Sequence, residues 1–294
     1  MNDYVIISDS TCDLSQELVD ELKVAIQPMS FTICDKEYKN YPDEREMKLE
    51  DFYNLMNEGH MGKTAQLNIV DVENFFTPYL EKELDILCVA FSSGLSGSCN
   101  SIRLAAQELS EKFPQRKIMV VDSLQASTGE GLLVYEAAIN KNNGMTIEEN
   151  VKSLESMKLN VRAWFTVSQL ETLRRGGRLS NAAAFAAKLL NIKPVLHVDD
   201  EGHLKAVYKK MGRKLALKQL IESSIDGYDK EGNHVTFISH ANCEDDALKV
   251  KEMLEEAYKK ENINSKILIS KIGPVIGSHA GPGTLAVFTI GDKR

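Results

Sequence analysis

A short apolar run that ends abruptly in a serine- and glycine-rich loop constrains the fold of this chain more than any other feature. Ile86–Ala90 is apolar without interruption, the loop Ser92–Ser98 follows almost at once, and apolar residues then recur at helical spacing from Ile102 to Phe113. An uninterrupted apolar run of this length, bounded by turn residues, is typical of a strand buried on both faces. The segment therefore predicts a strand, a loop and a helix of a parallel α/β sheet.

The same succession occurs at two other places in the first half of the chain. Val5–Ile7 runs into the polar segment Ser8–Asp13, and Lys117–Val121 ends at Asp122 and Ser123. Repeated alternation of strand and helix predicts a doubly wound parallel sheet, in which ligands bind at the carboxyl ends of the strands. Three polar strand ends are therefore expected along one rim of the sheet.

The pattern changes after about residue 160, and a chain of 294 residues is long enough for two domains, which we expect to cover residues 1–160 and 161–294. In the second part, Asp199–Gly202 has the composition of a hairpin turn between strands at Lys193–Val198 and Leu204–Tyr208. The predicted fold class is α/β, with an N-terminal three-layer parallel sheet domain and a second α/β domain that has a mixed sheet.

Five local predictions can be compared directly with a structure. A capping box over Thr146–Glu149 predicts the start of a helix. We also expect one edge strand from Val24 to Ile33, a turn-rich segment from Cys34 to Asp43, an Ala-rich helix from Asn181 to Leu190, and a rigid glycine-rich turn from Gly273 to Thr284.

Composition bears on the class of function. The 43% hydrophobic and 27% charged residues are ordinary for a globular protein. With 35 basic and 43 acidic residues the net charge is -8, so no nucleic-acid partner is expected, because such a partner requires a basic face. Neither an export signal nor a run of about eighteen apolar residues occurs, which predicts a cytoplasmic protein without a transmembrane segment. The five cysteines form no Cys-x-x-Cys pair, and we interpret them as packing or incidental thiols.

Three segments carry candidate ligand-binding groups. The loop Ser92–Ser98 offers hydroxyls and helix N–H groups that could cradle the oxygen of a carboxylate or a phosphate, although serine and glycine also form ordinary turns. Arg174–Arg178 contains three arginines in five residues, which either bind an anion or form a solvated charge run. His279 lies among glycines and prolines that would hold its imidazole at a fixed point, whereas a lone histidine is more often an ordinary residue.

Six segments in a fixed order resemble the motifs of the DegV family, and the resemblance covers nearly the whole chain. It implies a two-domain fold with a long-chain fatty acid buried between or within the domains. The segments are Asp9-Ser10-Thr11-Cys12-Asp13-Leu14, Lys63-Thr64-Ala65-Gln66, Ser92-Ser93-Gly94-Leu95-Ser96-Gly97, Leu173-Arg174-Arg175-Gly176-Gly177-Arg178, Lys193-Pro194-Val195-Leu196 and Gly277-Ser278-His279-Ala280-Gly281-Pro282-Gly283.

The resemblance also implies a function. Members of the family serve as the acyl-binding subunit of bacterial fatty acid kinase. In that system a separate kinase, related to dihydroxyacetone kinases, phosphorylates the fatty acid carboxyl group, and the acyl phosphate enters phospholipid synthesis. This chain would then carry and present a fatty acid as its ligand, with no cofactor, metal or ATP site of its own, and transient contact with a membrane is compatible with that role.

The resemblance transfers particular residues to the site. Thr64, Ser93 and His279 match positions that contact the fatty acid carboxylate, Gly94 would offer its backbone N–H, Ser96 is a further candidate, and Arg178 matches an arginine associated with the head group and phosphotransfer. Two departures concern the surroundings of the head group. Ala65 stands where many members have serine or threonine, and Lys209–Arg213 replaces the family's usual basic pair, so individual contacts with the kinase are not predicted.

Two other functions compete with this interpretation. A serine-dependent acyl hydrolase or transferase would use Ser93 or Ser96 as nucleophile and His279 as base, but the loop lacks the Gly-x-Ser-x-Gly elbow. A sugar- or nucleotide-binding regulator would use Asp9, Ser10 and Asp122 at the strand ends. Aspartates are poor partners for phosphate, and the sequence has neither Gly-x-Gly-x-x-Gly after the first strand nor a Gly-Lys-Ser/Thr loop.

Overall fold

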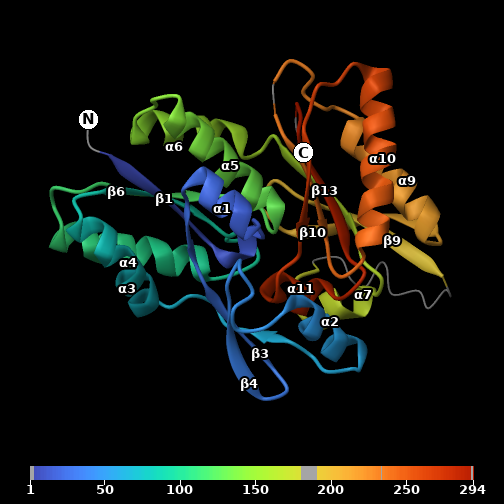
Figure 1. Cartoon of the computed structure of the whole chain (residues 1–294), viewed down its shortest axis with the longest axis horizontal. Helices are drawn as coiled ribbons and strands as arrows, with labels where there is room; N and C mark the ends of the chain where they lie inside the picture. Colours follow the sequence, from blue (N-terminus) through green and yellow to red (C-terminus); the bar gives the residue numbers. More distant parts are fainter. Residues whose placement is uncertain (1–2, 180–190, 233, 293) are drawn as a thin grey trace.

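Four parallel strands form the first sheet of the computed structural model, which describes residues 3–179, 191–232, 234–292 and 294 (Figure 1). Helices cover both faces of this sheet. One face carries α3 (Ile69–Glu81) and α4 (Ser98–Lys112), and the other carries α5 (Thr128–Asn142) and α6 (Ile147–Met157). The strand order is β2 (Ala25–Gln27), β1 (Tyr4–Asp9), β6 (Asp85–Ala90), β7 (Ile118–Asp122).

Side chains that alternate along the strands fill the two layers on either side of this sheet. Leu87 and Val89 belong to the hydrophobic cluster that contains α5, whereas Ile86 and Cys88 belong to the cluster that contains α3 and α4. Successive residues of a strand point to opposite faces, so a strand covered on both faces must be apolar throughout. The uninterrupted apolar run at Ile86–Ala90 is explained by this arrangement.

The second sheet has six strands, and all its neighbouring pairs are antiparallel except β11 and β12, which are parallel. Two helices, α9 (Arg213–Ile225) and α10 (Glu244–Glu261), cover one face of it. The strand order is β10 (Leu204–Met211), β9 (Ile192–Val198), β8 (Val161–Thr166), β13 (Leu285–Ile290), β11 (Thr236–His240), β12 (Ile267–Lys271).

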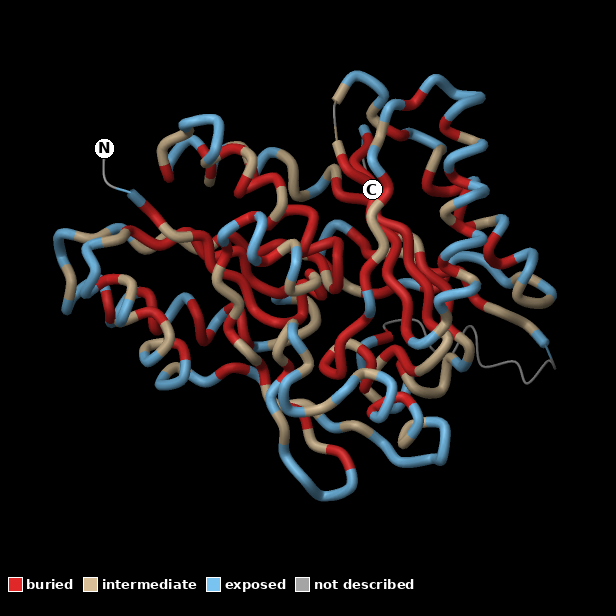
Figure 2. The backbone as a smooth tube through the Cα atoms, in the orientation of Figure 1, coloured by how far each residue is buried: buried red, intermediate tan, exposed pale blue. Residues whose placement is uncertain are grey.

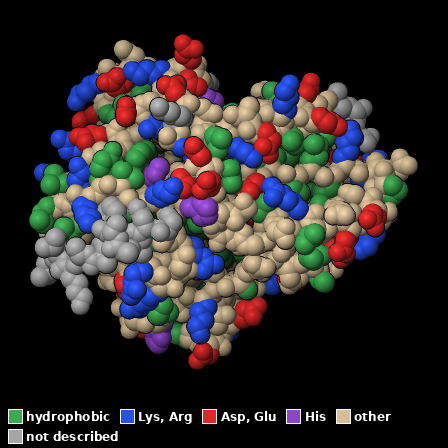
Figure 3. Space-filling model, turned by 180° about the vertical axis from the view of Figure 1, so that it is seen from behind, with side chains coloured by type: hydrophobic (Ala, Val, Ile, Leu, Met, Phe, Trp, Pro, Cys, Tyr) green, Lys and Arg blue, Asp and Glu red, His purple; other side chains and the backbone are tan. Residues whose placement is uncertain are grey.

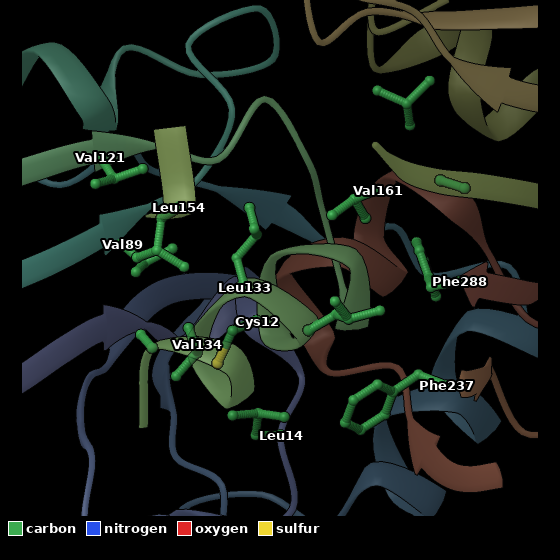
Figure 4. Close-up of a cluster of buried hydrophobic side chains, with 14 of the residues drawn as sticks. Cys12, Leu14, Val89, Val121, Leu133, Val134, Leu154, Val161, Phe237 and Phe288 are labelled. Carbon is green, nitrogen blue, oxygen red and sulfur yellow. The ribbon is translucent and has the colours of Figure 1, made fainter. Parts of the chain in front are cut away.

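The other face of the second sheet packs against the first half of the chain. Phe237 and Phe288 belong to the same buried cluster as Leu133 and Val134 of α5 (Figure 4). Most of α5 is buried between the two sheets (Figure 2). The strands of each sheet come from one side of residue 160 in the sequence, but this hydrophobic core contains residues from both sides. The division into two domains therefore stays a prediction.

A smaller three-stranded sheet lies below the junction of the two larger ones in Figure 1. Its strands are β4 (Lys36–Asn40), β3 (Met29–Ile33) and β5 (Lys63–Thr64). The described residues also form the helices α1 (Gln16–Leu22), α2 (Leu49–Asn57) and α7 (Leu170–Arg175). Between β12 and β13 the chain forms one more short helix, α11 (Pro274–Ala280), which packs against β3, β5 and α7.

The predicted fold class is confirmed, and several local predictions with it. The Thr146–Glu149 capping box is present, with both reciprocal hydrogen bonds formed, and β9 and β10 pair as the expected hairpin. The helix expected at Asn181–Leu190 lies outside the described residues. All five cysteines are free. Cys12, Cys88 and Cys99 are buried, as expected of packing thiols, and burial raises the pKa of Cys12 and Cys88, whereas Cys34 is exposed.

Three local predictions were wrong. The strand expected from Val24 to Ile33 is divided at Pro28 into β2 and β3, which belong to different sheets. Proline has no N–H for a strand ladder, so the chain changes sheets there. The segment from Cys34 to Asp43 contains the strand β4, whose polar side chains suit an exposed edge.

The segment from Gly273 to Thr284 is not a turn throughout, because it contains α11. Pro274 occupies the first turn of this helix, where its missing N–H costs nothing, and Gly281, with φ of 81°, ends it. Gly277, within this helix, allows close packing. A Cβ atom there would lie 2.5 Å from the Tyr53 hydroxyl oxygen.

Acidic and basic side chains are interspersed over the face of the molecule seen in Figure 3, without a broad area of one sign. Among the described residues, no helix is both long enough and apolar enough to cross a membrane.

Because the core crosses residue 160, truncating a side chain of α5 should destabilise both halves of the molecule together. Leu133 is 0% exposed, and we expect Leu133→Ala to lower the free energy of unfolding by about 2–5 kcal/mol. Urea unfolding, followed by far-UV circular dichroism and by the fluorescence of the single tryptophan, Trp164 on β8, should show the same loss.

The matched control is Leu159→Ala, the same change at a residue that is 42% exposed, with an expected effect within about 0.5 kcal/mol. A Trp164 transition that stays at the wild-type urea concentration in Leu133→Ala would show that the two halves unfold independently.

Candidate ligand-binding site

A cavity of about 300 Å³ lies where the second sheet, α11 and the loop after β6 meet. Most of its walls are apolar. The sheet contributes Ala163, Phe165, Ala286 and Phe288, α11 contributes Val275 and Ile276, and the loop contributes Phe91 and Leu95. A mostly apolar cavity with a few polar groups is typical of a small-molecule site.

A second cleft, of about 760 Å³, is larger, but it is lined by many charged side chains, so the smaller cavity suits an apolar ligand better.

Four of the six predicted site residues line the cavity, although they come from four separate segments. Thr64 lies on β5, Ser96 in the loop after β6, Arg178 after α7, and His279 in the last turn of α11. The Thr64 Oγ1 and the His279 Nε2 are 2.8 Å apart and hydrogen-bonded. The fold thus brings together two polar groups that are 215 residues apart in the chain.

The surroundings of His279 define its protonation. Burial, together with the nearby charge of Arg178, lowers its pKa to about 4, so the ring is neutral at pH 7. The Nδ1 atom is buried and has no hydrogen-bond partner among the described residues, and a Cβ atom on Gly176 would lie 2.5 Å from it. A buried N–H without an acceptor is costly, so the proton belongs on Nε2, which donates to Thr64.

Arg178 lies at the edge of the cavity with an exposed side chain. Its Nε donates to the backbone carbonyl of Leu95 at 3.3 Å, which ties the arginine to the serine loop. The guanidinium therefore adds positive charge beside Thr64 and His279 while remaining open to solvent.

The serine loop contributes less to the cavity than expected. Ser96 lines it, and the Ser96 hydroxyl accepts a hydrogen bond from the Ser98 N–H at 3.2 Å. Ser93 and Gly94 are not among the lining residues, and Ser93 is exposed. The Gly94 N–H donates to the Ser92 Oγ at 3.2 Å, and a Cβ on Gly94 would lie 2.5 Å from the Glu201 carbonyl oxygen. Gly94 thus permits close packing of the β9–β10 hairpin, and its N–H does not reach the cavity.

Three polar residues of the cavity, Gln66, Ser127 and Thr284, were not predicted as site residues from the sequence. Gln66 lies two residues after Thr64, and a Cβ on Gly97 would lie 2.3 Å from its Oε1. Ser127 precedes α5 with φ of 53°. The signal for Gln66 was its place in the segment Lys63–Gln66, whereas Ser127 lies in a segment that resembles no motif.

The aspartates at the strand ends, Asp9 and Asp122, form hydrogen bonds with the neighbouring backbone. The Asp9 carboxylate accepts hydrogen bonds from the backbone N–H groups of Thr11 and Phe91, and that of Asp122 from Ser93 and Leu124. Neither aspartate lines the cavity. In the described part of the chain one group of side chains, Asp199, Glu201 and His203, is spaced for a metal ion, but the Lys205 Nζ already pairs with Asp199 at 2.6 Å.

Comparisons with known proteins establish the family of the chain. Residues 3–292 match the family model described as "Uncharacterised protein, DegV family COG1307". The chain belongs to the DegV family. A DegV domain-containing protein of Clostridium perfringens is 40% identical to it, over 100% of this chain and 99% of the relative.

Two solved structures of the DegV family share the fold. A family member from Thermus thermophilus, described as binding fatty acid, has a TM-score of 0.87 and 29% identity, covering 98% of this chain and 99% of that one. A DegV lipid-binding protein from Thermotoga maritima has a TM-score of 0.85 and 28% identity, covering 99% of both chains.

The lowered pKa of His279 predicts a pH-dependent stability. Its pKa is about 4 in the folded protein and 6.5 in the unfolded chain, so the unfolded state binds more protons between these values. Stability is therefore lost as the pH falls from 6.5 to about 4, by at most about 3 kcal/mol from this residue. Urea unfolding over this range should show that His279→Gln removes this part of the loss.

His60→Gln serves as the control because His60 is exposed. It should unfold with the pH dependence of the wild type. An identical pH dependence in wild type and His279→Gln would contradict the assigned protonation.

Proposed function

We propose that this protein binds a long-chain fatty acid in the cavity, with the carboxylate at the Thr64–His279 end. The observation that carries the proposal is the hydrogen-bonded Thr64–His279 pair in an otherwise largely apolar cavity. The fatty acid and lipid binding described for the Thermus thermophilus and Thermotoga maritima relatives supports it.

The two ends of the cavity suit the two parts of such a ligand. Each methylene removed from water contributes about 0.8 kcal/mol, so Phe165, Phe288 and the other apolar walls supply affinity for the tail. A carboxylate taken out of water requires hydrogen-bond donors, and its position is set by them.

The donors at the polar end form a relay. The neutral His279 donates its Nε2 proton to the Thr64 oxygen, which frees the Thr64 hydroxyl proton for the fatty acid carboxylate. Ser96, in the loop after β6, offers a second hydroxyl. Arg178, which also lines the cavity, offers a positive charge that would attract the carboxylate. Ser93 and Gly94 would reach the carboxylate only if the loop moved.

The bound carboxylate would be presented to a separate kinase of the dihydroxyacetone-kinase type, in the cytoplasm, to form an acyl phosphate for phospholipid synthesis. The protein itself then needs no catalytic residue or cofactor. Arg178 is compatible with this division of work, because its exposed guanidinium lines the cavity and could pair with a phosphoryl group.

A serine hydrolase is less well supported. The base of such an enzyme hydrogen-bonds the nucleophile and is oriented by a third group. Here His279 bonds Thr64, its Nδ1 has no partner, and the Ser96 hydroxyl bonds Ser98.

The proposal predicts that the protein carries fatty acid from its expression host. Mass spectrometry of a denaturing extract should detect a fatty acid near one equivalent, and delipidated protein should take up added palmitate. Absence of both would refute fatty acid binding. A covalent serine adduct after fluorophosphonate treatment would favour the hydrolase.

Removing the Thr64 hydroxyl should weaken binding through the head group alone. A hydrogen bond to a charged group is worth about 1.5–3 kcal/mol, so Thr64→Val should raise the palmitate Kd by about 10- to 100-fold. Isothermal titration calorimetry provides the measurement.

Two matched variants complete this experiment. Thr64→Ser keeps the hydroxyl and should stay near wild type, and so should Ser93→Ala, because Ser93 does not line the cavity. If Ser93→Ala weakened binding as strongly as Thr64→Val, the carboxylate would lie against the serine loop instead.

A further inference from the structure

The segment Ser10–Asp13, which belongs to the first of the family-like segments, has no part in the cavity described above. It forms a single turn of 3-10 helix and a left-handed residue, Asp13, with φ of 50°. Asp13 is 7% exposed, and it lies behind the cavity wall, where the larger polar cleft begins.

The Asp13 carboxylate bridges two segments that form the cavity wall. Its Oδ2 accepts the Ser127 hydroxyl at 2.6 Å, and its Oδ1 accepts the backbone N–H of Gly273 at 2.8 Å. Its backbone carbonyl also accepts the Ser270 hydroxyl. One residue of the first half of the chain therefore holds both ends of the connection between β12 and α11.

Each partner leads directly to the ligand site. Ser127 lines the cavity and precedes α5. Gly273 precedes α11, whose last turn carries His279. Because α11 has only seven residues, a displacement of its first residue is carried to His279.

Close packing around Asp13 leaves α11 little freedom to shift. A Cβ on Gly273 would lie 2.9 Å from the Asp13 Oδ1 and 2.8 Å from the Asn40 Nδ2. On the other side, a Cβ on Gly131 of α5 would lie 2.6 Å from the Cys12 carbonyl oxygen. The Tyr53 hydroxyl donates to the Ile272 carbonyl at 2.7 Å, which fixes the residue before Gly273.

We propose that Asp13 is a positioning residue for the head-group site: by bridging Ser127 and Gly273 it sets α11 relative to α5 and so holds His279 against Thr64. The effect on the ligand rests on the fatty acid binding proposed above. The effect on the position of His279 does not rest on fatty acid binding, because the Asp13 hydrogen bonds to Ser127 and Gly273 form within the protein alone.

The conservative substitution at this position is asparagine. An asparagine oxygen can accept from Gly273, and its amide can donate to the Ser127 hydroxyl oxygen, so both bridges survive. Burial raises the pKa of Asp13 to about 7, partly opposed by its hydrogen bonds from Ser127 and Gly273. Alanine at the same position removes both bridges.

The test uses two independent readouts on the full chain. The first is nitrogen-15 NMR of the histidine rings in ligand-free protein, with the His279 signals among the six histidines assigned through His279→Gln. We expect Asp13→Ala to shift the His279 ring nitrogens and to broaden the Nε2 proton signal, while Asp13→Asn and the exposed-site control Asp20→Ala leave them unchanged.

The second readout is palmitate affinity by calorimetry. Asp13→Ala should raise the Kd by about tenfold, as expected when one head-group hydrogen bond is lost, and Asp13→Asn should restore it to within about twofold. If Asp13→Ala does not fold, Gly273→Ala replaces it, since its Cβ would push α11 away from Asp13.

The possible results separate the two proposals. A folded Asp13→Ala with wild-type His279 signals overturns the positioning role, whatever palmitate does. Shifted His279 signals in Asp13→Ala, restored in Asp13→Asn, support it. Wild-type protein that fails to bind palmitate refutes the proposed function, and the NMR result then decides the positioning of His279 alone.

Discussion

The packing of α5 between the two large sheets is the constraint on which the rest of the structure depends. Eleven of its 15 residues are buried, including the acid Glu130. Burial raises the pKa of Glu130, and the hydroxyls of Ser8 and Thr11 contact its carboxyl oxygens at 2.9 and 2.8 Å. A helix buried along most of its length packs against both sheets at once, and Ser127, just before α5, lines the cavity.

Much of the fold could be predicted from the sequence because its strongest patterns are local. The run at Ile86–Ala90 is apolar throughout since helices cover both faces of β6, and the Thr146–Glu149 box shows where α6 begins. The errors lie where tertiary contacts decide. Gly277 lies inside α11, where glycine is locally unfavourable. Tyr53 occupies the space that a side chain at this position would fill, and no local rule contains that contact.

The candidate site was predictable in part, for a related reason. Thr64 and His279 stand in recognisable segments, and the fold brings them to 2.8 Å from one another. Ser93 and Gly94 stand in an equally recognisable segment, yet Gly94 serves the packing of the β9–β10 hairpin. Resemblance in a loop identifies which residues matter, whereas only the backbone geometry tells which of them face the cavity. Ser127 and the walls from β8 and β13 are ordinary residues whose role arises from the arrangement of the sheets.

The central claim is that a fatty acid carboxylate lies against Thr64 and His279. NMR of palmitate labelled with carbon-13 at the carboxyl group tests it most directly. The account predicts a separate resonance for the bound carboxyl group, and the pKa of that group should differ from that of the free acid, because both burial and hydrogen-bond donors act on it. That resonance should shift in His279→Gln and in Thr64→Val. A bound carboxyl that titrates like the free acid, or that is unchanged in both variants, would contradict the account.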